Sequence, residues 1–362
     1  MTRAFTADRR TLTSLRLGAQ GIIEPTSGSV RDTVRHMLAM QAQDFAGAKW
    51  SVGLRTPGST DDAVEAALAS GEIVRSWPMR GTLHFTAAED LGWMLDLTAI
   101  RMVQSAAGRH RQLALSQRDF DHAKDLATEN LSGGRVLSRS ALLAVFDDAG
   151  LSTEGQRGAH LIGNLAQTGT IVFGPVDGKT QTFVLLDEWV REPRRLEGDA
   201  ALGEFALRYF TSHGPATVRD FAWWSSLTLT QARVGLAVAR RKLEELVVDD
   251  VPYYLAPDRQ PAPSGLATLP GFDEYLLGYQ DRSAPLHADH SELIVPGKNG
   301  LFLPTIVVDG EVVGTWKRVL TAKEASVQAQ PFAPLGGAQR AAFAASSARY
   351  AAFVERELAI VE

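Results

Sequence analysis

The pattern of apolar and polar residues departs from a helical repeat at Gln41. Gln41 occupies the next position on a helical face that is apolar until then, formed by Val30, Val34, Met37 and Leu38. Gln43 would share a face with Gln41 only if the chain becomes extended there, because helical side chains two residues apart point in nearly opposite directions. Gly47 indicates that the helix stops in this segment. We predict that Gln41 and Gln43 project into one cleft, with Ala42 turned away. The alternative is that both amides cap a helix end and contact local backbone.

The same kind of pattern predicts three helices and then a hairpin in the first third of the chain. The first helix begins after Asp8, the second ends at Gln41, and the third spans residues 61–70. Residues 73–77 and 81–85 are β-rich runs that predict a hairpin turning at residues 78–81. Residues 86–89 have the sequence of a capping box that opens a further helix. Three helices followed by a two-stranded hairpin is the order of a winged helix.

This order returns twice more along the chain. In the second copy, we expect helices at 119–130, 138–150 and 152–169 before a hairpin of 170–173 and 182–185. In the third copy, we expect helices at 202–213, 218–224 and 228–243 before strands at 246–248 and 253–255. The rest contains a hairpin around Asp309-Gly310 and an alanine-rich helix over residues 339–358. The predicted fold class is a helix-rich α+β fold of three tandem winged-helix modules. The predicted division is 1–115 (first winged helix, with the Gln41–Gln43 segment), 116–196 (second), 197–262 (third) and 263–362 (C-terminal hairpin and helix).

Composition narrows the class of protein. The chain has 362 residues, of which 45% are hydrophobic and 22% charged, which is typical of a soluble globular protein with more than one core. It has no cysteine, which excludes disulfides, thiolate zinc sites and cysteine nucleophiles and favours a cytoplasmic setting. We expect neither a secretory signal nor a membrane span. The net charge of −5 argues against a nonspecific nucleic-acid binder, which would usually be basic overall, yet a basic cleft can lie in an acidic body.

Motifs for other chemistries are incomplete. Residues 174–180 resemble a phosphate-binding loop, but three residues rather than four separate the two glycines, and the segment lies in a predicted hairpin. His287 and His290 could offer metal ligands, although no second cluster completes a site and a polar loop explains them equally well. We therefore expect neither a metal nor a cofactor.

Basic residues are spread over all three predicted modules. Arg75 and Arg80 flank the first hairpin, while Lys317 and Arg318 follow the last one. One interpretation is that these residues only solvate exposed faces. The other is that they contact phosphates along a duplex and line a groove.

Taken together, these features resemble a known family, the tandem winged-helix DNA glycosylases of the AlkZ/YcaQ type. The resemblance rests on an ordered set of short segments that span nearly the whole chain: residues 40–44, 75–84 and 272–279, Asp281-Arg282, and residues 299–316. It implies three winged helices in a C-shaped arrangement around double-stranded DNA, in a protein that is a monomer.

The resemblance also implies site residues. The catalytic motif of the family is Gln, an aliphatic residue, then Gln or Asp, and it falls on Gln41, Ala42 and Gln43. Gln rather than Asp at position 43 resembles the AlkZ branch, which is linked to self-resistance against DNA-alkylating natural products, while Ala42 is a small version of the aliphatic residue. The DNA-binding residues that we expect are Asp44, Arg75, Arg80, His84, Arg282, Lys298, Asn299, Lys317 and Arg318.

The expected chemistry is hydrolysis of the N-glycosidic bond of N7-alkylated purines. Alkylation at N7 makes the base a good leaving group, and bond cleavage passes through an oxocarbenium-like state. An amide has no useful pKa and cannot act as a general base, but it can orient a water molecule and stabilise positive charge. Two points stay open at this stage: whether the base is flipped out of the helix, and whether the protein is instead a noncatalytic regulator or damage sensor.

Overall fold

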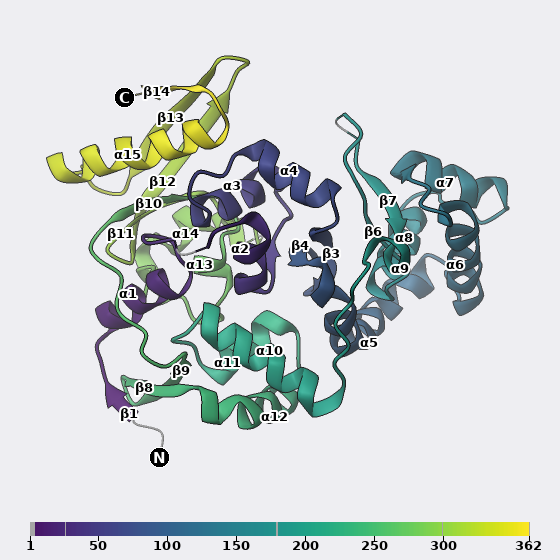
Figure 1. Ribbon diagram of the computed structural model, residues 1–362, viewed down its shortest axis with the longest axis horizontal. Coiled ribbons are helices and arrows are strands. Elements are labelled where there is room, and N and C mark those ends of the chain that lie inside the picture. The colour runs from purple at the N-terminus through teal and green to yellow at the C-terminus, as the bar shows by residue number, and fades with distance from the viewer. Residues whose placement is uncertain (1–3, 26, 179, 299, 362) are drawn as a thin grey trace. The chain divides into compact units, whose positions relative to one another are not determined.

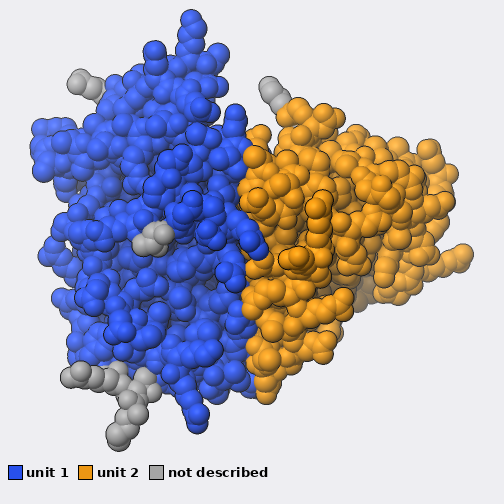
Figure 2. Space-filling view, viewed as in Figure 1, with its two compact units in different colours: residues 1–64, 202–362 blue, residues 65–201 orange. Residues whose placement is uncertain are grey.

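The computed structural model describes residues 4–25, 27–178, 180–298 and 300–361. The chain forms two compact units, of which one comprises Met1–Val64 and Leu202–Glu362 (unit 1) and the other Glu65–Ala201 (unit 2) (Figure 2). One unit boundary falls inside α4 (Asp61–Ala69), between Val64 and Glu65, and the other falls near the start of α10 (Gly198–Ser212). Unit 1 is therefore built from the two ends of the sequence.

A five-stranded sheet lies in the C-terminal part of unit 1 (Figure 1). Its strands, in spatial order, are β10 (Leu266–Leu269), β11 (Thr305–Val308), β12 (Glu311–Leu320), β13 (Glu324–Pro331) and β14 (Glu357–Val361). The predicted hairpin is confirmed, because β11 and β12 pair antiparallel around Asp309 and Gly310. Both turn residues have positive φ, of 49° and 92°, which a tight hairpin turn requires.

The final helix, α15 (Gly337–Phe353), is shorter than we predicted. It ends at Phe353, and Glu357 begins strand β14, which pairs parallel to β13. The ring of Trp50, on α3 (Phe45–Arg55), lies 5.2 Å from Tyr350 and 5.3 Å from Phe353. These aromatic contacts pack α3 against α15.

A smaller sheet of unit 1 joins the N-terminus to a distant hairpin. Strand β1 (Ala4–Thr6) pairs parallel to β8 (Glu244–Val248), which pairs antiparallel to β9 (Val251–Leu255). The helix α1 (Arg9–Ala19) begins after Asp8, whose side chain accepts a hydrogen bond from the backbone of Thr11, as the predicted cap requires. Its buried leucines, Leu12 and Leu15, pack on this sheet.

The remaining elements of unit 1 are mostly helical. Thr217 and Thr228 each form a capping box at the start of a helix. The elements are α2 (Val30–Met37), β2 (Met40–Gln41), α11 (Val218–Ser225), α12 (Leu229–Ala239), η1 (Arg240–Lys242), α13 (Glu274–Leu277), η2 (Ala288–His290), α14 (Ser291–Ile294) and η3 (Pro296–Lys298).

Both hairpins that we predicted between residues 65 and 201 form in unit 2. The first hairpin pairs β3 (Ile73–Met79) with β4 (Thr82–Ala87), and the second pairs β6 (Ile171–Phe173) with β7 (Thr182–Leu185) in a sheet of order β5-β7-β6. A buried cluster around Phe120, Phe146 and Leu161 forms its main core. The other elements are α5 (Ala88–Gln112), α6 (Gln117–Leu131), β5 (Leu137–Ser138), α7 (Arg139–Asp148), α8 (Arg157–Gln167) and α9 (Leu186–Trp189).

Two local predictions were wrong. The predicted capping box at residues 86–89 does not form, because α5 begins at Ala88 with no side-chain cap and the hydroxyl of Thr86 has no hydrogen-bond partner. The predicted helix that ends at Gln41 stops at Met37 instead, and Gly47 lies inside the next helix, α3. The mixture of helices and strands agrees with the predicted fold class. The tandem winged-helix arrangement and the four-part division stay predictions.

Within the described ranges, no helix combines the length and the apolar character that crossing a membrane would need.

Candidate active site

The segment that holds Gln41 and Gln43 begins as a strand and bends at Gln43. The helix α2 ends because Leu38 has a φ of 66°, which breaks the helical path, and Met40 and Gln41 then form strand β2. Burial alternates along this segment, since Met40 and Ala42 are fully buried, Gln41 is half-buried and Gln43 is exposed. This is the two-residue period of an extended chain. It confirms that Ala42 is turned into the protein. That both line one cleft stays a prediction.

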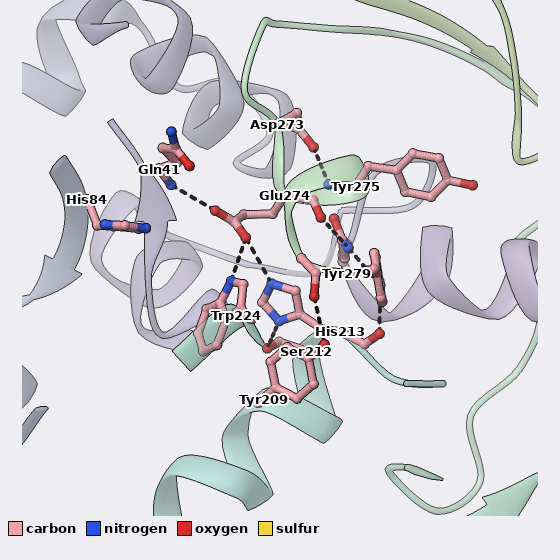
Figure 3. A network of polar contacts seen from close by, with 12 residues as sticks. Gln41, His84, Tyr209, Ser212, His213, Trp224, Asp273, Glu274, Tyr275 and Tyr279 are labelled. Atoms are coloured by element: carbon pink, nitrogen blue, oxygen red, sulfur yellow. Dashed lines mark hydrogen bonds and ion pairs between the residues drawn. The ribbon is translucent and has the colours of Figure 1, made fainter. Parts of the chain in front are cut away.

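A buried carboxylate holds the backbone of Gln41. The Oε1 atom of Glu274, on α13, accepts a hydrogen bond of 2.9 Å from the Gln41 backbone N–H (Figure 3). Its Oε2 atom accepts one of 2.8 Å from the indole N–H of Trp224 and lies 3.4 Å from Nε2 of His213. Only 1% of Glu274 is exposed. In the sequence, Glu274 lies in residues 272–279, one of the segments that carry the family resemblance, but no local pattern indicates its partner, which is 233 positions away.

The neighbouring carboxylate fixes α13 from its other side. Asp273 accepts hydrogen bonds of 2.9 and 2.8 Å from the two terminal nitrogens of Arg55 and one of 2.6 Å from Ser51, both on α3. It also caps α13 by accepting from the backbone N–H of Tyr275. Because Arg55 and Asp273 are almost fully buried, this bidentate ion pair joins α3 to α13 in a water-poor interior.

Three buried tyrosines lie on or next to α13. Burial raises the pKa of Tyr209, Tyr275 and Tyr279 well above its usual value, so their hydroxyls stay protonated. Each hydroxyl donates to a backbone carbonyl: Tyr209 to Gly278, Tyr275 to Gly310, and Tyr279 to His213. The ring of His213 stacks on Tyr209 at 4.9 Å. The three hydroxyls therefore tie α13 and the residues that follow it to the surrounding backbone.

Asp44 and Arg318 lie next to each other in unit 1. Asp44 is at the cap position of α3 without forming a side-chain cap, and its Oδ2 lies 3.6 Å from Nη2 of Arg318. The guanidinium of Arg318 stacks over the rings of Trp316 and Tyr350. A Cβ atom on Gly47 would lie 2.5 Å from Oδ2 of Asp44, so the small residue there leaves room for this carboxylate. The structure thus brings two predicted DNA-binding residues together beside the Gln41–Gln43 segment.

The predicted DNA-binding residues of unit 2 lie around its first hairpin and are already bonded within the protein. Arg75 is 6% exposed, donates to Oε1 of Gln181 at 2.5 Å and stacks over the ring of Phe173. His84 is fully buried, with its ring nitrogens 2.9 Å from Nη2 of Arg80 and from the carbonyl of Thr82. Contact between these buried side chains and DNA stays a prediction, and it would require them to become exposed.

The other predicted DNA-binding residues belong to unit 1. Arg282 stacks over the rings of Trp223 and Phe302 at 4.9 and 5.0 Å and donates to the carbonyl of Leu276. Lys317 is exposed on β12. Asn299 and the side chain of Lys298 lie outside the described residues. In the part of the chain that the structure describes, no group of three or more histidine, cysteine, aspartate or glutamate side chains is placed to hold a metal ion.

Comparison with known proteins identifies the family. The family model "DNA glycosylase AlkZ-like" matches residues 34–353, which include the Gln41–Gln43 segment, α13 and α15. The chain belongs to the AlkZ-like DNA glycosylase family. It is thus an enzyme, a DNA glycosylase, and the predicted resemblance is confirmed.

Two comparisons, both with proteins of one organism, support the AlkZ branch. The chain is 29% identical over 320 residues to an "Interstrand DNA cross-link repair glycosylase" of Streptomyces sahachiroi. The aligned residues cover 82% of this chain and 84% of that protein. Among solved structures it is similar to the Streptomyces sahachiroi DNA glycosylase AlkZ, with a TM-score of 0.82 and 25% identity over 99% of this chain and 100% of the other. The mixed helix-and-strand fold of an AlkZ-like glycosylase therefore extends over nearly all of the chain.

Proposed function

We propose that this AlkZ-like glycosylase hydrolyses the N-glycosidic bond of N7-alkylated purines in double-stranded DNA, and that its substrates include bulky adducts and interstrand cross-links. The cross-link part of the proposal is supported by the similarity to a relative that is named for cross-link repair. The catalytic part is supported by two uncharged amides that keep exposed surface, since Gln41 is half-buried and Gln43 is exposed on either side of the buried Ala42 in the sequence.

In the proposed reaction, the bond between C1′ and N9 breaks and its electron pair goes to the purine, which cancels the positive charge that N7 alkylation placed on the ring. Water adds to C1′ and loses a proton to solvent, which leaves an abasic site and a free alkylated base. The amides of Gln41 and Gln43 hold this water in line, and their carbonyl oxygens stabilise positive charge at C1′. No lysine Schiff base is involved, so the enzyme is monofunctional.

A weak catalytic group is an advantage for this substrate. Neutral purines are poor leaving groups, and an amide, which cannot remove a proton from water, does too little to release them. An N7-alkylated purine needs less assistance because its bond is already labile. The amide pair therefore gives selectivity for damaged bases without a tight pocket around the base. This reasoning requires no metal or cofactor, and water is the only co-reactant.

The arrangement on DNA is also a proposal. Three winged helices, with the predicted boundaries at residues 115, 196 and 262, would present basic side chains along a duplex. We keep Asp44, Arg75, Arg80, His84, Arg282, Lys298, Asn299, Lys317 and Arg318 as the proposed contacts. We propose that the protein acts as a monomer in the cytoplasm.

The test is base release by the variants Gln41→Ala and Gln43→Ala. Duplexes that carry N7-methylguanine or an N7-linked cross-link are incubated with excess enzyme, and abasic sites are scored over time. We expect each variant to lose about 10²–10³-fold in single-turnover rate, the effect of removing one oriented hydrogen-bonding group. Affinity for the duplex should change by no more than about threefold, because two neutral side chains carry little of the phosphate attraction.

Gln117→Ala is the matched control, because it removes an exposed amide at the start of α6, in unit 2. It should release base at the wild-type rate. Unchanged release by the double variant Gln41→Ala/Gln43→Ala would refute the catalytic assignment. Covalent trapping of the enzyme on DNA by borohydride would refute the monofunctional mechanism.

A further inference from the structure

Glu274 is a buried carboxylate that the proposed reaction does not use directly. Both of its oxygens accept hydrogen bonds from N–H groups, one from the backbone of Gln41 and one from Trp224, and His213 lies beside the second oxygen (Figure 3). Burying a charged group is unfavourable unless its surroundings compensate for the lost water. A hydrophobic or neutral side chain would fill this position at lower cost, so the carboxylate calls for an explanation.

The segment that Glu274 contacts is a short strand. Strand β2 consists only of Met40 and Gln41, and one residue separates it from the irregular residue Leu38. The direction of the Gln41 side chain depends on the orientation of its backbone, because the Cα–Cβ bond is fixed relative to the N–H and carbonyl groups. A hydrogen bond from a backbone N–H to a charged acceptor is stronger than one to a neutral acceptor. The carboxylate therefore fixes the residue whose amide must be held in place.

We propose that Glu274 is a positioning residue, which fixes the backbone of Gln41 so that its side-chain amide points at the reacting water. The inference rests on the proposed function, since it assigns a role to Glu274 only if Gln41 acts on the water. Asp273, which α3 binds through Arg55 and Ser51, anchors the short helix that carries Glu274. The positioning therefore runs from α3 through α13 to Gln41.

The side chains around Glu274 do not form a nucleophilic triad, although the order of contacts suggests one. The Ser212 hydroxyl lies 2.8 Å from Nδ1 of His213, and Nε2 of His213 faces Glu274. Both Ser212 and His213 are fully buried. The Ser212 hydroxyl also bonds to the carbonyl of Arg208, as a helical serine does. No substrate carbon can reach a buried hydroxyl, so these residues support Glu274 rather than attack DNA.

The test is the substitution Glu274→Gln in the full-length protein. It keeps the size of the side chain but places an NH₂ group against either the Gln41 N–H or the Trp224 N–H, so that two donors face each other. We expect the single-turnover release of N7-methylguanine to fall about 10²-fold, because a small misplacement of a reacting group has this effect. The dissociation constant for the duplex should stay within about threefold of the wild-type value. With ¹⁵N-labelled glutamine, the Gln41 amide proton should move upfield as its charged acceptor is lost.

Tyr275→Phe is the matched control, because it removes a buried hydrogen bond from the adjacent residue of α13 without touching Gln41. It should release base at the wild-type rate. An equal loss in Tyr275→Phe would mean that Glu274→Gln acts through general destabilisation, and the proposal would be wrong. It would also be wrong if Glu274→Gln released base at the wild-type rate while Gln41→Ala did not. Full release by Gln41→Ala would instead refute the proposed function itself.

If Glu274→Gln does not fold, Glu274→Asp takes its place. This variant keeps the charge but withdraws the carboxylate by one methylene from Gln41. We expect this variant to release N7-methylguanine more slowly than the wild type, with unchanged affinity for the duplex. A folded Glu274→Asp protein with the wild-type rate would overturn the proposal.

Discussion

Two consecutive carboxylates on α13 are buried for different purposes. Asp273 forms a bidentate ion pair with Arg55 and therefore has a cationic partner. Glu274 accepts from a backbone N–H and from an indole N–H, and His213 lies 3.4 Å from its second oxygen. The first arrangement holds two helices together, while the second holds the segment of a proposed catalytic residue. Adjacent residues of the same charge can thus differ completely in what their loss would do.

Asp273→Ala should destabilise the protein by about 3–5 kcal/mol, because it leaves Arg55 buried without its carboxylate. The measurement is the shift of the denaturation midpoint of unit 1 in urea, followed by tryptophan fluorescence. Arg9→Ala is the control, since it breaks an ion pair with Asp249 whose side chains are 59% and 62% exposed. That change should cost less than about 1 kcal/mol. Equal midpoints for the two variants would contradict the prediction.

At the residue scale, the sequence indicates the unusual residue but not what supports it. Gln41 is conspicuous because an amide interrupts an apolar helical face, and this pattern is local. Its partner Glu274 is 233 positions away, and no spacing rule connects the two. The burial of His84 was equally hidden, because a histidine near two arginines suggests an exposed basic surface, whereas here Arg80 and a carbonyl bind its ring.

At the element scale, close packing of α3 on α15 depends on a glycine. A Cβ atom on Gly53 would overlap the ring of Phe353, and Phe353 is itself buried against Trp50. The ring therefore occupies the space that any larger residue would need. Sequence reasoning treats a glycine as a helix breaker, yet here its small size is what lets two helices approach.

Gly53→Ala should destabilise the protein by about 1–3 kcal/mol through overpacking, despite the higher helix propensity of alanine. Gly163→Ala in α8 is the matched control, because a Cβ atom there meets nothing within 4 Å. It should be neutral or stabilise by up to about 1 kcal/mol. Both effects are measured as shifts in the thermal unfolding midpoint. The packing argument fails if Gly53→Ala is as stable as Gly163→Ala.

Elements with local signals were predicted well, and elements with remote partners were missed. The hairpin at Asp309-Gly310 and the helices capped by Ser138, Thr217 and Thr228 are specified by neighbouring residues. Strands β1 and β14 were missed because each pairs parallel with a strand that is not its hairpin neighbour. Helix α3 was missed because Gly47 and Gly53 lower its propensity, and tertiary packing decides the outcome instead.

At the scale of the whole molecule, an acidic protein has to bind a polyanion. The net charge of −5 makes the overall field unfavourable for DNA, so local groups of basic residues must supply the attraction. Arg318 is partly engaged with Asp44 and two aromatic rings, whereas its neighbour Lys317 points to the other face of β12 and is exposed. Lys317 is therefore the clearer candidate for a phosphate contact.

Lys317→Ala should weaken binding to all duplexes by a similar factor and should reduce the slope of log K against log[salt] by about 1. The measurement is duplex affinity by fluorescence anisotropy between low and moderate salt. Lys323→Ala is the control, because it removes another exposed lysine near the end of the same strand. An unchanged slope in Lys317→Ala would show that this residue does not contact a phosphate.

The contact between Glu274 and Gln41 has a consequence for the order of events during synthesis. Ribosomes add about 5–20 residues per second, so roughly 10–50 s pass between the emergence of Gln41 and that of Glu274. Throughout this interval the nascent chain carries Gln41 without the carboxylate that is proposed to position it. Loop closure over so many residues also comes late in folding. If Glu274 positions Gln41 as proposed, a chain that ends before Glu274 should release N7-alkylated bases more slowly than the full-length protein.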